Sequence, residues 1–78
     1  MSEATYQKKL IKELEAEGYY VLKLISTNKA GIPDLVALKP NDVKFIEVKG
    51  KLTKVSELQK YRIKELKKLG FYATIERE

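Results

Sequence analysis

The stretch that decides the fold is GIPDLVALKPNDVKFIEVKGK, residues 31–51. It contains two apolar runs, PDLVALK and VKFIEVK, separated by the residues of a turn, KPND. Because β-branched and aromatic residues favour strands while Pro, Asn and Asp favour turns, the pattern predicts an antiparallel β-hairpin. Each predicted strand carries an acid, Asp34 at the start of the first and Glu47 near the end of the second.

The register of the hairpin brings these acids together. If KPND forms a four-residue loop, Leu38 pairs with Val43 and Asp34 pairs with Glu47. Side chains alternate along a strand, so both acids and Lys49 lie on one face of the predicted sheet. Directly opposed residues have Cβ atoms only about 4.5–5.5 Å apart, and like charges there are destabilising. The pair therefore requires a shared proton, which raises one pKa, or a cation between the carboxylates.

The composition limits the nature of that cation. The chain has no histidine and no cysteine, so only oxygen ligands are available, and these select a hard ion, Mg²⁺ or Mn²⁺. The same absence excludes, within this chain, nucleases with a histidine base, histidine-ligated zinc hydrolases and Ser-His-Asp hydrolases.

Two interpretations of the acids, one catalytic and one structural, remain open. Magnesium binds through one or two carboxylates together with substrate phosphate oxygens, so Asp34 and Glu47 indicate phosphodiester hydrolysis, with Lys49 orienting or deprotonating a water. The structural alternative is that the acids and Lys49 form ordinary ion pairs, since E-x-K is a common tripeptide.

A helix is predicted ahead of the hairpin, over residues 2–17, with an apolar stripe at Leu10, Ile11 and Leu14. Helical phase places Glu3 near the core-facing edge of the first turn. An acid in that position complements the helix dipole, so a purely structural role for Glu3 is the alternative to a role in a site.

A second helix is predicted over residues 57–69. Ser56 and Gln59 have the S-x-x-Q spacing of a capping box at its start, and Gly70 ends it. The residues expected on its inner face are Leu58, Ile63, Leu66 and Leu69.

Two further strands, YYVLKLI at residues 19–25 and FYATIE at residues 71–76, complete an α-β-β-β-α-β order. The second helix joins the third strand to the fourth, so those two strands should be parallel. The prediction is one α/β domain over residues 1–78, with a four-stranded mixed sheet flanked by two helices.

Charge points to a polyanionic partner. The net charge is +5, with 16 Lys and Arg against 11 Asp and Glu, which favours DNA or RNA. A charge run on a helix is usually its solvated face, yet several basic residues surround the predicted acids. The candidate DNA-binding residues are Lys29, Lys51, Lys54, Lys60 and Arg62.

Size and cysteine content bound the setting. A chain of 78 residues has a thin core and gains from self-association. The lack of cysteine fits a reduced, cytoplasmic environment. The longest apolar run, YYVLKLI, is too short to span a bilayer, so no membrane partner is expected.

Three segments, GIPDLVAL, FIEVKGK and SELQ, together resemble the PD-(D/E)xK nuclease superfamily. Within it the chain is most similar to the VRR-NUC family, especially its compact stand-alone, virus-type members, and it shares features with archaeal Holliday junction resolvases. The resemblance covers nearly the whole chain, from SEATYQ to FYATIE. It implies a restriction-endonuclease-like core and a Mg²⁺-dependent endonuclease in which Mn²⁺ substitutes.

The resemblance also implies roles for individual residues. Asp34 matches the metal-binding aspartate, and Glu47 and Lys49 match the E-x-K pair. Glu3 matches an acid on the first helix that points at the active site and joins the metal ligands. Gln59 matches the glutamine that opens the following helix, although its capping role remains an alternative.

The substrate expected from the resemblance is branched DNA, in particular the Holliday junction, cut by a homodimer. Candidate aromatic residues for the dimer interface are Tyr19, Tyr20, Phe71 and Tyr72, with packing in the core as the alternative role for each of them. Two alternatives stay open: a nicking or flap nuclease without junction preference, and a basic nucleic-acid-binding module whose acids are merely structural.

Overall fold

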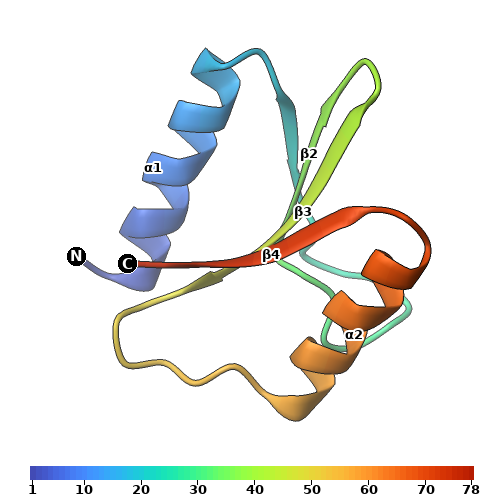
Figure 1. The fold of residues 1–78 in the computed structure, drawn as a ribbon. Coiled ribbons are helices and arrows are strands. Elements are labelled where there is room, and N and C mark those ends of the chain that lie inside the picture. The colour runs from blue at the N-terminus through green and yellow to red at the C-terminus, as the bar shows by residue number, and fades with distance from the viewer.

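The computed structural model describes all 78 residues, in the order α-β-β-β-α-β (Figure 1). The predicted fold class is therefore confirmed. No helix is long or apolar enough to cross a membrane. The elements are α1 (Glu3–Ala16), β1 (Tyr20–Lys23), β2 (Leu35–Lys39), β3 (Asp42–Lys49), α2 (Glu57–Lys68) and β4 (Tyr72–Arg77).

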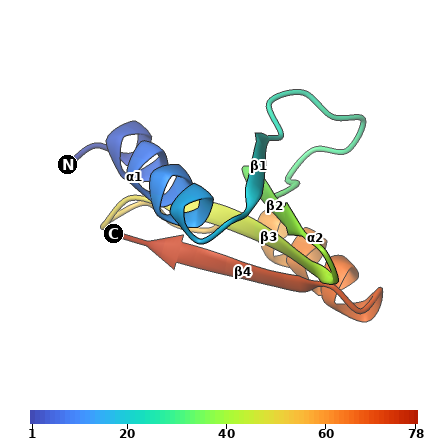
Figure 2. The same ribbon diagram turned by 90° about the horizontal axis from the view of Figure 1, so that it is seen from above.

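The four strands form one mixed sheet in the order β1-β2-β3-β4. β2 pairs antiparallel with both β1 and β3, whereas β3 and β4 are parallel. The parallel pair follows from the connection through α2, as the sequence predicted. The two helices lie on opposite sides of this sheet (Figure 2).

The main core lies between α1 and the sheet. Leu35 and Ala37 on β2 and Ile46 and Val48 on β3 are buried there against Leu14 of α1. These strand residues alternate with those that face α2, because successive side chains point to opposite faces. The sheet thus has an apolar face under α1 and a face under α2 that carries the acids.

The β2–β3 turn is shorter than expected. Lys39 pairs with Asp42, so the loop contains only Pro40 and Asn41 rather than four residues. Asn41 adopts a positive φ of 63°, which asparagine tolerates better than most residues. The register of the hairpin is the predicted one, because the extra pair simply extends the same ladder.

The first strand is also shorter than predicted, since β1 covers Tyr20–Lys23 instead of residues 19–25. Tyr19, just before it, is 6% exposed, and its hydroxyl donates a hydrogen bond to the carboxylate of Asp42. Tyr19 is therefore part of the core and is unsuited to a dimer interface.

The inner face of α2 differs from the prediction at two of its four leucine and isoleucine positions. Leu58 is 42% exposed and Leu69 is 72% exposed, whereas Ile63 is buried. The row that faces the sheet consists of Gln59, Ile63 and Leu66, at helical i, i+4 and i+7 spacing. The other two leucines lie on the flank of the helix.

Candidate active site

The hairpin register places two acids opposite each other. Leu35 pairs with Ile46, and one further step along both strands sets Asp34 against Glu47. The N–H of Val48 donates a 3.0 Å hydrogen bond to Oδ2 of Asp34, so this carboxylate is fixed to β3 just before β2 begins. The facing arrangement expected from the sequence is present.

Glu47 is the buried centre of the site, at 2% exposure. Its Oε2 accepts a hydrogen bond from Nε2 of Gln59 at 2.9 Å and lies 3.4 Å from Nζ of Lys49. Its Oε1 is buried and has no hydrogen-bond partner. A buried carboxylate oxygen without a partner is costly, which indicates that a proton or a cation is needed at this position.

The environment of Glu47 disfavours its charge. Burial and, after it, the nearby charge of Asp34 raise the pKa of Glu47 from 4.5 to about 7, although Lys49 partly offsets both effects. Glu47 is therefore close to half-protonated at neutral pH in the metal-free protein.

The side chain of Lys49 is only 9% exposed and lies beside the equally buried Glu47. A buried ammonium group is costly unless an acid accompanies it, and Glu47 is that acid. Lys49 is thus held where it can exchange a proton with its neighbourhood or stabilise negative charge that develops next to Glu47.

Gln59 combines the two roles that the sequence left as alternatives. Its side-chain Oε1 accepts a hydrogen bond from the backbone N–H of Ser56 at 3.0 Å. The backbone N–H of Gln59 donates to Oγ of Ser56 at 3.1 Å, which completes the capping box. The other end of the same amide, Nε2, donates to Glu47. The start of α2 is thereby tied to the buried acid.

Glu3 approaches the site from α1. Its Oε1 accepts a 3.0 Å hydrogen bond from the N–H of Gly50, the residue that follows β3. Its charge also raises the pKa of Glu47 and is the smallest of the causes of that shift. No group of three or more acids lies close enough to hold a metal ion, so Glu3 does not join Asp34 and Glu47 in a three-carboxylate cluster in this structure.

The candidate DNA-binding residues fall into two groups. Lys29, Lys51 and Lys54 are exposed on the loops next to the acids, and none of them forms an ion pair. Lys60 instead pairs with Glu57 on α2 at 3.3 Å. The remaining candidate, Arg62, forms a hydrogen bond within the protein, to the loop that precedes β2.

Arg77 was not identified from the sequence. Its Nη1 donates to the carbonyl oxygens of Gly50 at 2.9 Å and Thr53 at 2.6 Å, and lies 3.5 Å from that of Lys51. Arg77 thus holds the loop between β3 and α2. The only available signal was the parallel register, which places Arg77 beside Lys49.

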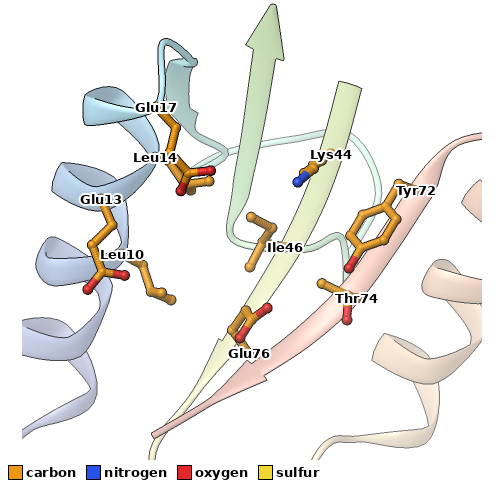
Figure 3. Close-up of a pocket in the computed structure, with 9 residues that line it drawn as sticks. All are labelled: Leu10, Glu13, Leu14, Glu17, Lys44, Ile46, Tyr72, Thr74 and Glu76. Atoms are coloured by element: carbon orange, nitrogen blue, oxygen red, sulfur yellow. The ribbon is translucent and has the colours of Figure 1, made fainter. Parts of the chain in front are cut away.

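A second concavity lies on the other face of the sheet, between α1 and the strands β3 and β4 (Figure 3). Glu13, Glu17 and Glu76 line it together with a single basic residue, Lys44. Three acids against one lysine repel a polyanion. This groove is therefore distinct from the candidate active site, to which β3 presents Glu47 on the opposite face.

The donor set of the site fits a hard divalent cation. Asp34 and Glu47 offer carboxylate oxygens, no nitrogen or sulfur ligand is near, and Oε1 of Glu47 lacks any other partner. Such a donor set, with a buried lysine beside the two acids, is suited to phosphodiester hydrolysis.

Comparison with known proteins gives one match. The family model described as the VRR-NUC domain matches residues 1–77, almost the entire chain. This match confirms the resemblance drawn from the motifs around the hairpin. No curated protein matches the chain.

Proposed function

The chain belongs to the VRR-NUC domain family, and on that premise we propose that it is a metal-dependent endonuclease that hydrolyses DNA phosphodiester bonds. The family carries nuclease activity of the PD-(D/E)xK type and usually uses divalent metals. The observation that supports a catalytic site here is the buried, unpartnered Oε1 of Glu47, facing Asp34 across the hairpin.

Asp34 and Glu47 would hold the metal, for which we propose Mg²⁺, with Mn²⁺ as a substitute. When bound, such an ion polarises a phosphoryl oxygen and lowers the pKa of a coordinated water. We assign Glu3 to the same site as a third acid. Its carboxylate would act there either by leaving its hydrogen bond with the N–H of Gly50 or through its charge alone. Gln59 keeps Oε2 of Glu47 occupied, which would leave Oε1 available to the cation.

Lys49 is the positively charged residue of the proposed catalytic site. Its ammonium group lies 3.4 Å from Glu47 and is shielded from solvent, so a negative charge on an attacked phosphate interacts with it strongly. We assign Lys49 to orient the attacking water and to balance the charge of the phosphoryl oxygens.

Branched DNA, such as a Holliday junction, is the substrate that we propose. The net charge of +5 and the exposed lysines on the loops beside the acids support contact with several phosphates, without a motif for reading bases. A four-way junction has two-fold symmetry and needs paired incisions, so we propose a homodimer. Tyr20, Phe71 and Tyr72, 68%, 41% and 55% exposed, are the aromatic residues left for its interface.

The test compares a synthetic four-way junction with linear duplex, single-stranded and flapped DNA, with and without Mg²⁺. The wild type should cut the junction only with metal, while Asp34→Ala and Glu47→Ala should bind DNA without cutting it. Glu57→Gln is the matched control, because the side chain of Glu57 is 92% exposed on α2.

The outcomes separate the candidate functions. Equal cutting of flapped, nicked and junction DNA would replace junction selectivity by a flap or nicking activity. DNA binding without cutting in any metal would leave a basic binding module and refute the catalytic proposal.

A further inference from the structure

An apolar groove lies between α2 and the loop that joins β1 to β2, which run side by side in Figure 1. Its volume of about 450 Å³ is in the range of small-molecule sites. Besides Glu65, its lining residues are Ile32, Tyr61, Leu66, Leu69, Lys29 and Lys68.

Two of these residues expose more apolar surface than a helix flank needs. Tyr61 is 55% exposed and Leu69 is 72% exposed, and no other element of the chain covers them. Leu69 is one of the positions at which helical periodicity predicted burial. An aromatic and an aliphatic side chain gathered in one groove indicate an apolar or aromatic ligand.

The charge of the groove favours an anionic ligand. Lys29 and Lys68 both line it, and the single acid, Glu65, is neutralised by Nη1 of Arg62 at 2.8 Å. The guanidinium of Arg62 also lies 5.5 Å from the ring centroid of Tyr61. An aromatic ring with basic neighbours is the combination that proteins use to bind single-stranded nucleic acid.

The groove adjoins the part of the candidate active site that contains Asp34. Lys29 and Ile32 line both the groove and the polar hollow in which Asp34 lies. A ligand in the groove therefore lies beside the hollow of Asp34.

The loop between the groove and the hollow is fixed in place. Nε of Arg62 donates to the carbonyl of Ala30 at 2.9 Å. Gly31 has a positive φ of 80°, and a Cβ there would lie 2.7 Å from Leu58, so only glycine permits this approach of the loop to α2. The groove is thus preformed, which lowers the entropic cost of binding.

We propose that this groove binds an unpaired nucleobase of the DNA strand that enters or leaves the active site. The base stacks on Tyr61 and contacts Leu69, while Lys29 and Lys68 bind the adjoining phosphates. The inference rests on the proposed nuclease function and deepens it, because it makes an unpaired base next to the cut, at an opened junction or on a single-stranded arm, part of the recognised substrate.

The test measures binding of two DNA probes by fluorescence anisotropy in EDTA, where cleavage is suppressed. One probe is a blunt duplex, and the other is the same duplex with a short single-stranded arm of either polarity. Tyr61→Ala should weaken binding of the armed probe by about tenfold, the loss of one stacked base, and leave the blunt probe unchanged. Tyr61→Phe should bind as the wild type does.

Leu22→Ala is the control, because Leu22 is 41% exposed and lies on β1, outside the groove. Equal binding by the Tyr61→Ala and Leu22→Ala variants would overturn the inference. So would a shift of Tyr61→Ala from dimer to monomer in analytical ultracentrifugation, since the groove would then be an interface between two copies of the chain.

A second measurement needs no variant. With 2-aminopurine at successive arm positions, wild-type protein should change the emission most at one position, whereas a uniform response would overturn the inference. Failure of the wild type to bind or cut any DNA would instead refute the proposed function. If the wild type is active and the Tyr61→Ala variant binds the armed probe equally well, only the proposal that the groove binds a base is refuted.

Discussion

Replacing Glu47 by glutamine should change how the free energy of unfolding depends on pH in the metal-free protein. Burial and the charge of Asp34 raise the pKa of Glu47 to about 7, while an unfolded chain has the ordinary value of 4.5. Between these values the folded protein holds a proton that the unfolded chain has released. The wild type therefore loses stability as the pH rises through this window, and the contribution is complete only below pH 4.5.

The magnitude follows from the width of the window. Each pH unit within it costs the wild type at most about 1.4 kcal/mol, so the whole window is worth roughly 3 kcal/mol. Glutamine does not titrate. The stability of Glu47→Gln relative to the wild type should therefore rise by roughly that amount between pH 4.5 and 7.5.

The assay is urea unfolding followed by far-UV circular dichroism, at half-unit pH steps and in EDTA. Glu57→Gln, which removes an exposed acid on α2, is the matched control for the loss of one carboxylate. A Glu47→Gln difference that does not change with pH would refute the reasoning, because it would mean that Glu47 is ionised in the folded protein throughout.

Lys49→Ala should keep Mg²⁺ binding, measured by calorimetry, and lose about a hundredfold or more in single-turnover cleavage; unchanged turnover would remove Lys49 from the mechanism. Glu3→Gln keeps an acceptor for the N–H of Gly50 but removes the charge, so it should impair cleavage without lowering the melting temperature, and full activity would leave Glu3 a structural role. Arg77→Ala should lower stability by about 1–3 kcal/mol and speed amide exchange in the loop between β3 and α2, whereas unaltered exchange would contradict the clamp. DNA binding should weaken steeply with salt, because phosphate contacts release counterions, and a flat response in titrations at several KCl concentrations would argue against a backbone-binding surface.

The hairpin and the parallel crossover were predictable because both depend on local patterns. Alternating apolar residues and the turn at Pro40 and Asn41 define the hairpin, and its register alone brings Asp34 to Glu47. The capping box of Gln59 was equally local. Its second bond, to Glu47, was not visible in the sequence by spacing, because it depends on how α2 docks on the sheet.

The failures concern contacts set by tertiary structure. Helical periodicity cannot tell a face that meets the sheet from a flank that meets only a loop, so Leu58 and Leu69 were misplaced. Arg77 acts on carbonyl groups more than twenty residues away in the chain, and backbone acceptors leave no mark on the residue types around them. Which of the candidate aromatic residues packs in the core was not predictable, because the hydroxyl partner of Tyr19, Asp42, lies across the fold.

The amide of Gln59 can occupy its position in only one orientation. A rotation that exchanged its oxygen and nitrogen would set an N–H against the N–H of Ser56 and an oxygen against the carboxylate of Glu47, so both bonds would be lost together. A glutamate at residue 59 would match one end of this link and repel the other. Unwinding of the first turn of α2 would therefore also break the hydrogen bond that holds Glu47, the acid on which the proposed chemistry depends.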